Sequence, residues 1–161
     1  MNKQDALNLW NGLHAVSGLK GAKWAYAVAK NINNLKSEIE ALQKSIAPSK
    51  EFSEYNNKRL ELAQKHAAKE KGVPKKIKIG NTEEYLIADK NKFNKELKPL
   101  QKKYKKALDE RDKQMKDFEE ILKEEVKIDL HMVDSDYIPE EITPAQVTAV
   151  MPIINEKEDK T

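Results

Sequence analysis

The sequence predicts a mainly α-helical protein built on one long antiparallel helical hairpin with coiled-coil-like character. Three observations support this. Two long stretches carry apolar residues at alternating three- and four-residue steps, a short segment with β periodicity lies between them, and glycines and prolines are few. Residues at such steps fall on one stripe of a helix, along which two helices pack. The two stripes are Val28, Ile32, Leu35, Ile39, Leu42 and Ile46, and Phe93, Leu97, Leu100, Tyr104, Leu108, Met115, Phe118 and Leu122.

The 161 residues suit one elongated domain at 1–154, followed by a disordered charged tail at 155–161. A hydrophobic fraction of 39% with 6% aromatics favours an elongated hairpin, which buries less surface per residue than a globule. The absence of cysteine excludes disulfide frameworks, thiolate zinc sites and cysteine nucleophiles. No run approaches the roughly 20 apolar residues that span a bilayer, and residues 1–19 lack the apolar core of a signal peptide. A soluble intracellular protein is expected.

The first arm of the hairpin is expected over 22–70. A short helix over 3–16 precedes it, and the glycines at 18 and 21 turn that helix back. Pro48 ends or kinks the arm near Ala47, because proline lacks an amide hydrogen and its ring crowds the preceding turn. Ser49 is suited to cap a restart. The arm is therefore one kinked helix, or two helices joined at Pro48.

A β-hairpin over 75–88 is expected at the tip, because its residues alternate around the turn signal Gly80-Asn81. Asp89 is a suitable N-cap for the second arm, which spans 90–124. Pro99 predicts a kink or a break in that arm near Lys98.

Strand periodicity returns after the second arm, over 126–133. This strand pairs with something near the base of the hairpin, pairs with another chain, or lies as an extended strap against the first helix. Thr143 and Gln146 stand at capping-box spacing, and Pro144 occupies the first helical position. A short helix over 143–150 follows.

Residues that carry catalytic or metal chemistry form no recognisable constellation. His14, His66 and His131 fall in three different elements, and none has a second ligand at metal-binding spacing. No glycine-rich phosphate loop, nucleophile elbow or zinc-binding His-Glu pattern occurs. The sequence therefore predicts no enzyme, no metal, no cofactor and no small-molecule substrate.

The net charge of +3 conceals a polarity along the chain. Basic and acidic residues number 7 and 3 in residues 1–50, 16 and 10 in 51–110, and 7 and 14 in 111–161. This asymmetry fits a nucleic-acid surface, head-to-tail packing of two chains, or solvated helix faces. Lysines gather at the tip and at the start of the second arm without any arginine, which favours phosphate-backbone contacts over base reading. The candidate nucleic-acid-binding residues are Lys71, Lys75, Lys76, Lys78, Lys98, Lys102, Lys105 and Lys106.

Two surfaces are candidates for contact with a protein. Trp10 and Trp24 flank the glycine turn, and they either pack in the core or anchor a partner, because buried tryptophans are enriched at interface hot spots. The apolar residues of the 126–133 strand form the second surface. The candidate protein-interface residues are Trp10, Trp24, Ile128, Leu130 and Met132.

A series of short motifs follows the order of these elements. They are Gly18-Leu19-Lys20-Gly21, Ala29-Lys30-Asn31-Ile32, Glu119-Glu120-Ile121-Leu122 and Glu125-Val126-Lys127-Ile128. In this order the chain resembles a group of small tailed-bacteriophage proteins catalogued as domain of unknown function 1617. The resemblance implies a phage origin and a non-enzymatic accessory or virion-associated role, in the cytoplasm of an infected bacterium or in the particle. It implies no activity, cofactor or catalytic residue.

Two hypotheses for function emerge. The first is an interaction protein that acts through helical contacts with a protein partner or with a second copy of itself. The alternative is a nucleic-acid-binding protein that uses the lysine-rich tip and second arm for sequence-independent contacts to the phosphate backbone.

Overall fold

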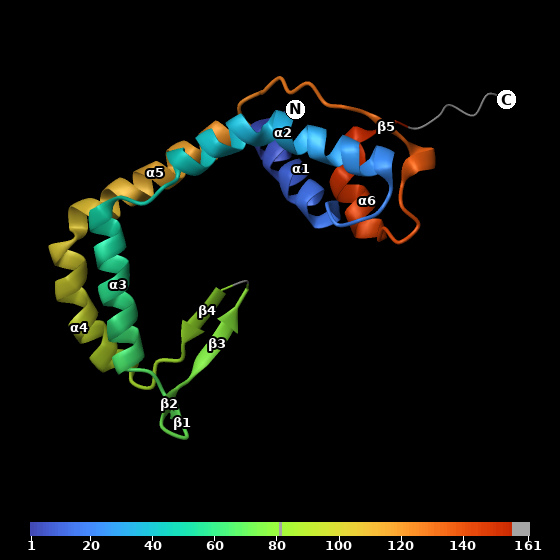
Figure 1. Cartoon of the computed structure of the whole chain (residues 1–161). Helices are drawn as coiled ribbons and strands as arrows, with labels where there is room; N and C mark the ends of the chain where they lie inside the picture. The colour runs from blue at the N-terminus through green and yellow to red at the C-terminus, as the bar shows by residue number, and fades with distance from the viewer. Residues whose placement is uncertain (81, 156–161) are drawn as a thin grey trace. The chain divides into compact units, whose positions relative to one another are not determined.

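A computed structural model describes residues 1–80 and 82–155 of the chain, which is mainly helical with small strand pairs (Figure 1). Where the sequence predicts a single elongated domain, the contacts divide the chain into two compact units. The first unit combines Met1–Ile46 with Lys116–Thr161, and the second is Ala47–Met115. Helix α5 (Lys105–Lys123) contributes residues to both.

The first unit has its core between helices α1 (Lys3–Val16), α2 (Ala22–Ser45) and α6 (Pro144–Val150). The predicted turn at the glycines is confirmed, since α1 folds back onto α2. The capping box of α6 is also confirmed, because the Thr143 hydroxyl accepts from the Gln146 amide at 3.3 Å. The buried apolar residues of this core are Ala6, Leu9, Leu13, Val16, Trp24, Ala27, Val28, Leu35, Ile39, Leu42, Val133, Val150, Ile153 and Ile154.

The predicted strand over 126–133 is largely wrong. Residues 126–132 belong to no strand and run as a coil from the end of α5 (Figure 1), and we call them the strap. Only β5 (Val133–Asp134) is a strand, paired in parallel with β6 (Ile154–Asn155). Alternation alone could not distinguish a strand from a coil segment whose backbone is bonded by side chains. Asn155 was expected in the disordered tail and lies in β6, while the rest of that predicted tail, 156–161, is outside the described residues.

Short 3-10 turns lead into and out of this small sheet. They are η1 (Ser135–Tyr137), which follows β5, and η2 (Met151–Ile153), which precedes β6.

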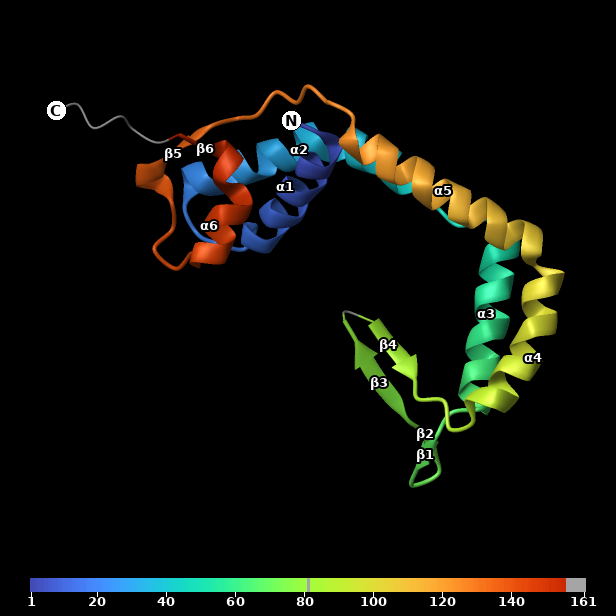
Figure 2. The same ribbon diagram turned by 180° about the vertical axis from the view of Figure 1, so that it is seen from behind.

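The second unit contains the antiparallel pair α3 (Lys50–Lys65) and α4 (Lys90–Lys103), which lie side by side in Figures 1 and 2. Ring contacts fix their direction, because Tyr55 lies 6.0 Å from Tyr104 and His66 lies 6.2 Å from Phe93 between ring centroids. The predicted break at Pro48 is confirmed, and Ser49 caps α3 by accepting from the Phe52 amide at 3.1 Å.

The second arm does not break where proline predicts. Pro99 lies inside α4, and the interruption falls at Tyr104, between α4 and α5. Proline removes one backbone donor and crowds the preceding turn. Pro99 is exposed, so water can reach the carbonyl that has lost its partner, and the helix continues.

The first arm ends at Lys65, before the predicted residue 70, because the backbone that follows pairs with other strands. The amide of Ala68 donates to Leu86, that of Leu86 to Lys75, and that of Lys75 to Ala68, at 2.7, 2.9 and 2.7 Å. This ring of three bonds joins two antiparallel pairs. They are β1 (Lys69–Glu70) with β2 (Val73–Pro74), and β3 (Lys76–Ile79) with β4 (Thr82–Tyr85). The second pair is the predicted hairpin.

Candidate functional site

A depression of about 390 Å³ opens on the first unit. Two segments form it: the first turns of α2 and the stretch from the end of the strap to η1. The lining residues are Ala22, Lys23, Tyr26, His131, Met132, Val133, Asp134 and Tyr137.

Large apolar side chains surround this depression without being covered. Tyr26, Met132 and Tyr137 are 59%, 47% and 40% exposed, and we call these three residues the Tyr26 surface. Isolated apolar side chains are common on protein surfaces, whereas several around one depression indicate a contact site.

The aromatic rings of the Tyr26 surface are held by neighbours. The Tyr26 ring meets the His131 ring edge-on, with centroids 5.3 Å apart. The Lys23 ammonium donates to the Tyr137 hydroxyl at 2.6 Å and lies 4.0 Å from the centre of that ring. These contacts restrict the rotamers of both tyrosines and reduce the entropy that a partner would have to remove.

A buried asparagine positions one wall of the depression. Asn31 is completely buried, and its carbonyl Oδ1 accepts from the backbone amide of His131 at 2.8 Å. Its Nδ2 donates to the backbone carbonyls of His131 and Ala27, at 2.8 and 2.9 Å. One side chain thus satisfies both backbone groups of His131, as a neighbouring strand would.

A second asparagine on α2, about one turn further along, makes a single bond to the strap. The Nδ2 of Asn34 donates to the carbonyl of Asp129 at 2.7 Å. The strap is therefore bonded to α2 by amide side chains, and this brings His131 and Met132 beside Tyr26. Sequence reasoning missed Asn31. The available signal was a polar residue within the apolar stripe, three residues after Val28 and four before Leu35.

The predicted protein-interface residues occupy different environments. Trp24 is completely buried in the core, which removes it as a surface anchor, and its indole Nε1 has no hydrogen-bond partner within the described part of the chain. Trp10 is half-buried, with its ring 4.6 Å from that of His14. Ile128 and Leu130 are half-buried against the core, so Met132 is the exposed member of the set.

The predicted lysines of the tip are exposed, but acidic neighbours offset several of them. Lys75 lies 3.1 Å from Glu70, and Lys76 lies 3.6 Å from Glu83. Lys78 stands opposite Glu83 in the β3–β4 register. Lys71 occupies the β1–β2 turn with a positive φ of 52°.

The predicted lysines of the second arm have fewer acidic neighbours. Lys98, Lys102 and Lys105 form no ion pair within residues 1–80 and 82–155, whereas Lys106 lies 3.7 Å from Glu110. The structure therefore separates two groups of predicted lysines. Lys75, Lys76, Lys78 and Lys106 lie beside glutamates, whereas Lys71, Lys98, Lys102 and Lys105 have no ion pair in the part of the chain that the structure describes.

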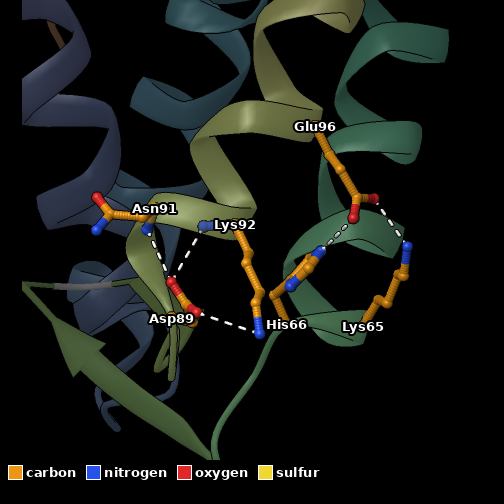
Figure 3. A network of polar contacts seen from close by, with 6 residues as sticks. All are labelled: Lys65, His66, Asp89, Asn91, Lys92 and Glu96. Carbon is orange, nitrogen blue, oxygen red and sulfur yellow. Dashed lines mark hydrogen bonds and ion pairs between the residues drawn. The ribbon is translucent and has the colours of Figure 1, made fainter.

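A polar network fixes the first turns of α4 (Figure 3). The Asp89 carboxylate accepts from the backbone amides of Asn91 and Lys92, both at 3.1 Å, which confirms the predicted N-cap. The Lys92 amide is the main cause that lowers the pKa of Asp89. The Glu96 carboxylate accepts from Lys65 at 2.8 Å and lies 3.1 Å from His66, at the end of α3. The bond from Lys65 is the main cause of the lowered pKa of Glu96.

Among the described residues, no group of three or more His, Cys, Asp or Glu side chains is arranged to hold a metal ion. None of the described helices is both long enough and apolar enough to cross a membrane. Comparison of the chain with family models, curated proteins and solved structures finds no match.

Proposed function

We propose that this chain is a non-enzymatic interaction protein that binds a segment of a protein partner through the Tyr26 surface. The observation that carries the proposal is the gathering of three exposed large apolar side chains around one depression. Tyrosine and methionine are enriched at protein interfaces, and tyrosine is among the residues that dominate binding energy there.

The chemistry of the depression supports a peptide-like occupant. Its lining combines apolar and aromatic side chains with His131, and Lys23 and Asp134 supply one charge of each sign. A volume of about 390 Å³ suits one or two side chains of a partner. Burial of apolar area contributes about 25 cal/mol per Å², so the Tyr26 surface can anchor a contact when the surrounding polar groups are paired.

The phage origin is part of this proposal and rests on the motifs around Gly18–Gly21 and Glu119–Ile128. It implies an accessory or virion-associated role in an infected bacterium. The long coiled-coil-like hairpin is proposed as the scaffold, on the strength of the two apolar stripes.

A peptide selection followed by titration tests the proposal. A displayed library of random peptides is selected on the full-length protein, and an enriched peptide is then titrated by calorimetry. Tyr26→Ser with Met132→Ser should weaken its binding at least tenfold, because two anchors are lost.

The matched control is Met151→Ser, since Met151 is 44% exposed in the same unit but does not line the depression. Sedimentation velocity of the same variants reports whether the partner is a second copy. The proposal would be contradicted if no peptide is enriched and the protein is also monomeric. It would also be contradicted if the control and the double variant lose the same amount of peptide affinity.

A further inference from the structure

Packing on α3 gives α4 two opposite faces. Phe93, Leu97, Leu100 and Tyr104 recur at helical spacing, are buried or half-buried, and face α3, where Phe93 meets His66 and Tyr104 meets Tyr55. At about 100° per residue, Lys95, Lys98 and Lys102 fall on the opposite side of the helix. We call these three lysines the lysine face. All three are exposed to solvent.

The lysine face is not neutralised by its surroundings. Residues 90–106 contain eight lysines and one acidic residue, Glu96, whose carboxylate is bonded to Lys65 and His66 of α3. None of the three lysines has an ion-pair partner within the described ranges. The unbalanced charge extends to the whole second unit, Ala47–Met115, which has 19 basic and 11 acidic residues, a net +8.

Amide side chains accompany these lysines. A depression of about 420 Å³ on α4 is lined by Asn91, Asn94, Lys95, Leu97, Lys98 and Gln101. Lysine, asparagine and glutamine are residue types that bond to phosphate oxygens in nucleic-acid complexes. The lysine face thus lies beside neutral hydrogen-bond donors, and Leu97 is the apolar residue of this depression.

We propose that the lysine face of α4 binds the phosphodiester backbone of a nucleic-acid duplex, independently of the protein-binding surface proposed for the first unit. From Lys95 to Lys102 the charges extend over roughly 10 Å of helix, at a rise of 1.5 Å per residue. A duplex presents about one negative charge per 1.7 Å of its axis, so three lysines can each neutralise a phosphate.

Two features decide the class of ligand. The absence of arginine from residues 90–106 disfavours bidentate recognition of guanine and favours backbone contacts without sequence preference. An anionic membrane is a poorer fit, because an interfacial helix inserts an apolar face, and that face of α4 packs on α3.

Fluorescence anisotropy with labelled duplexes tests the proposal on the full-length protein. The probes are a 20-base-pair DNA duplex, an RNA duplex of the same length and the DNA single strand, each measured between 50 and 200 mM salt. Loss of three phosphate contacts should reduce the slope of log affinity against log salt by about 2.7, at about 0.9 per phosphate. Over this fourfold range of salt, that slope corresponds to about a 40-fold change in affinity.

The test variant is Lys95→Gln, Lys98→Gln and Lys102→Gln, since glutamine removes charge and nearly preserves helix propensity. The matched control removes three charges from the hairpin, by Lys75→Gln, Lys76→Gln and Lys78→Gln. The proposal requires that the protein binds a duplex and that the slope of log affinity against log salt becomes smaller in the test variant. In the control, the change in this slope should be less than half of the change in the test variant. No duplex binding, equal changes in both variants, or binding confined to single strands or to phosphatidylserine vesicles would overturn it.

Discussion

Replacing Asn31 with alanine should release the strap and disassemble the Tyr26 surface. The substitution removes the partners of the His131 amide and carbonyl, both 2.8 Å from the Asn31 side chain. Loss of the partner of a buried polar group costs about 1–3 kcal/mol, and the lower end applies here because these bonds are part-buried and water can replace them. The higher helix propensity of alanine offsets about 0.5 kcal/mol.

Two backbone groups at about 1 kcal/mol each, less the propensity gain, leave a net loss of about 1.5 kcal/mol expected for Asn31→Ala in the free energy of unfolding of the first unit, or roughly 13-fold in its equilibrium constant. Tryptophan fluorescence during guanidinium denaturation measures this unit selectively, because Trp10 and Trp24 both belong to it and are the chain's two tryptophans. Hydrogen exchange at the His131 amide reports the local release directly.

Asn33→Ala is the matched control, since Asn33 lies on the same helix and is exposed. It should leave stability unchanged or raise it by a few tenths of a kcal/mol. The Asn31→Ala variant should also bind the selected peptide more weakly, although Asn31 is completely buried and cannot touch it. Equal stability of the two variants, with unchanged exchange at His131, would refute the role assigned to Asn31.

Two further predictions concern the packing of the first unit and the charges of the second. A Cβ on Gly12 would lie 2.7 Å from the Ala149 carbonyl oxygen and 2.9 Å from its Cβ, so Gly12→Ala should destabilise the first unit by about 1–3 kcal/mol, the usual cost of overpacking. A higher fluorescence-monitored denaturation midpoint, as helix propensity alone would give, would show that α1 and α6 do not pack this closely. The pKa values of Asp89 and Glu96 are lowered, so both carboxyls bind protons less tightly in the folded protein than in the unfolded chain. They therefore stabilise the folded protein above their unfolded pKa values, near pH 4. This stabilisation is lost as the pH falls through their folded pKa values. Asp89→Asn with Glu96→Gln should therefore flatten the acid limb of stability against pH, followed by tyrosine fluorescence, and an unaltered limb would exclude these two carboxyls as its cause.

Local chemistry was sufficient wherever a feature depends on a few consecutive residues. Examples are the helix over 3–16, the caps at Ser49, Asp89 and Thr143, and the pairing of β3 with β4. The caps depend on side chains that bond to nearby backbone amides, and the strand pair connects residues close in the sequence. The break that was one of the two outcomes predicted at Pro99 does not occur, because the cost of an interior proline depends on whether water reaches the freed carbonyl.

The sequence showed the two apolar stripes, but it did not show which helices they pack against. A stripe shows that a face is buried without showing against what, and the buried part of the first stripe packs in the core with α1 and α6, while the start of the second packs on α3. Burial fractions also separate Trp24 from Met132, two candidates that the sequence treats alike.

Neighbouring residues are enough to set the helical class, the caps and turns, and the excess of lysine in the second arm. The tertiary structure alone decided the environment of each group. It placed Asn31 against a backbone 100 residues away, gathered Tyr26, Met132 and Tyr137 around one depression, and separated hairpin lysines beside glutamates from unpaired lysines on α4. The physical reason is that hydrogen bonds, burial and charge balance depend on distance in space, which sequence separation does not measure.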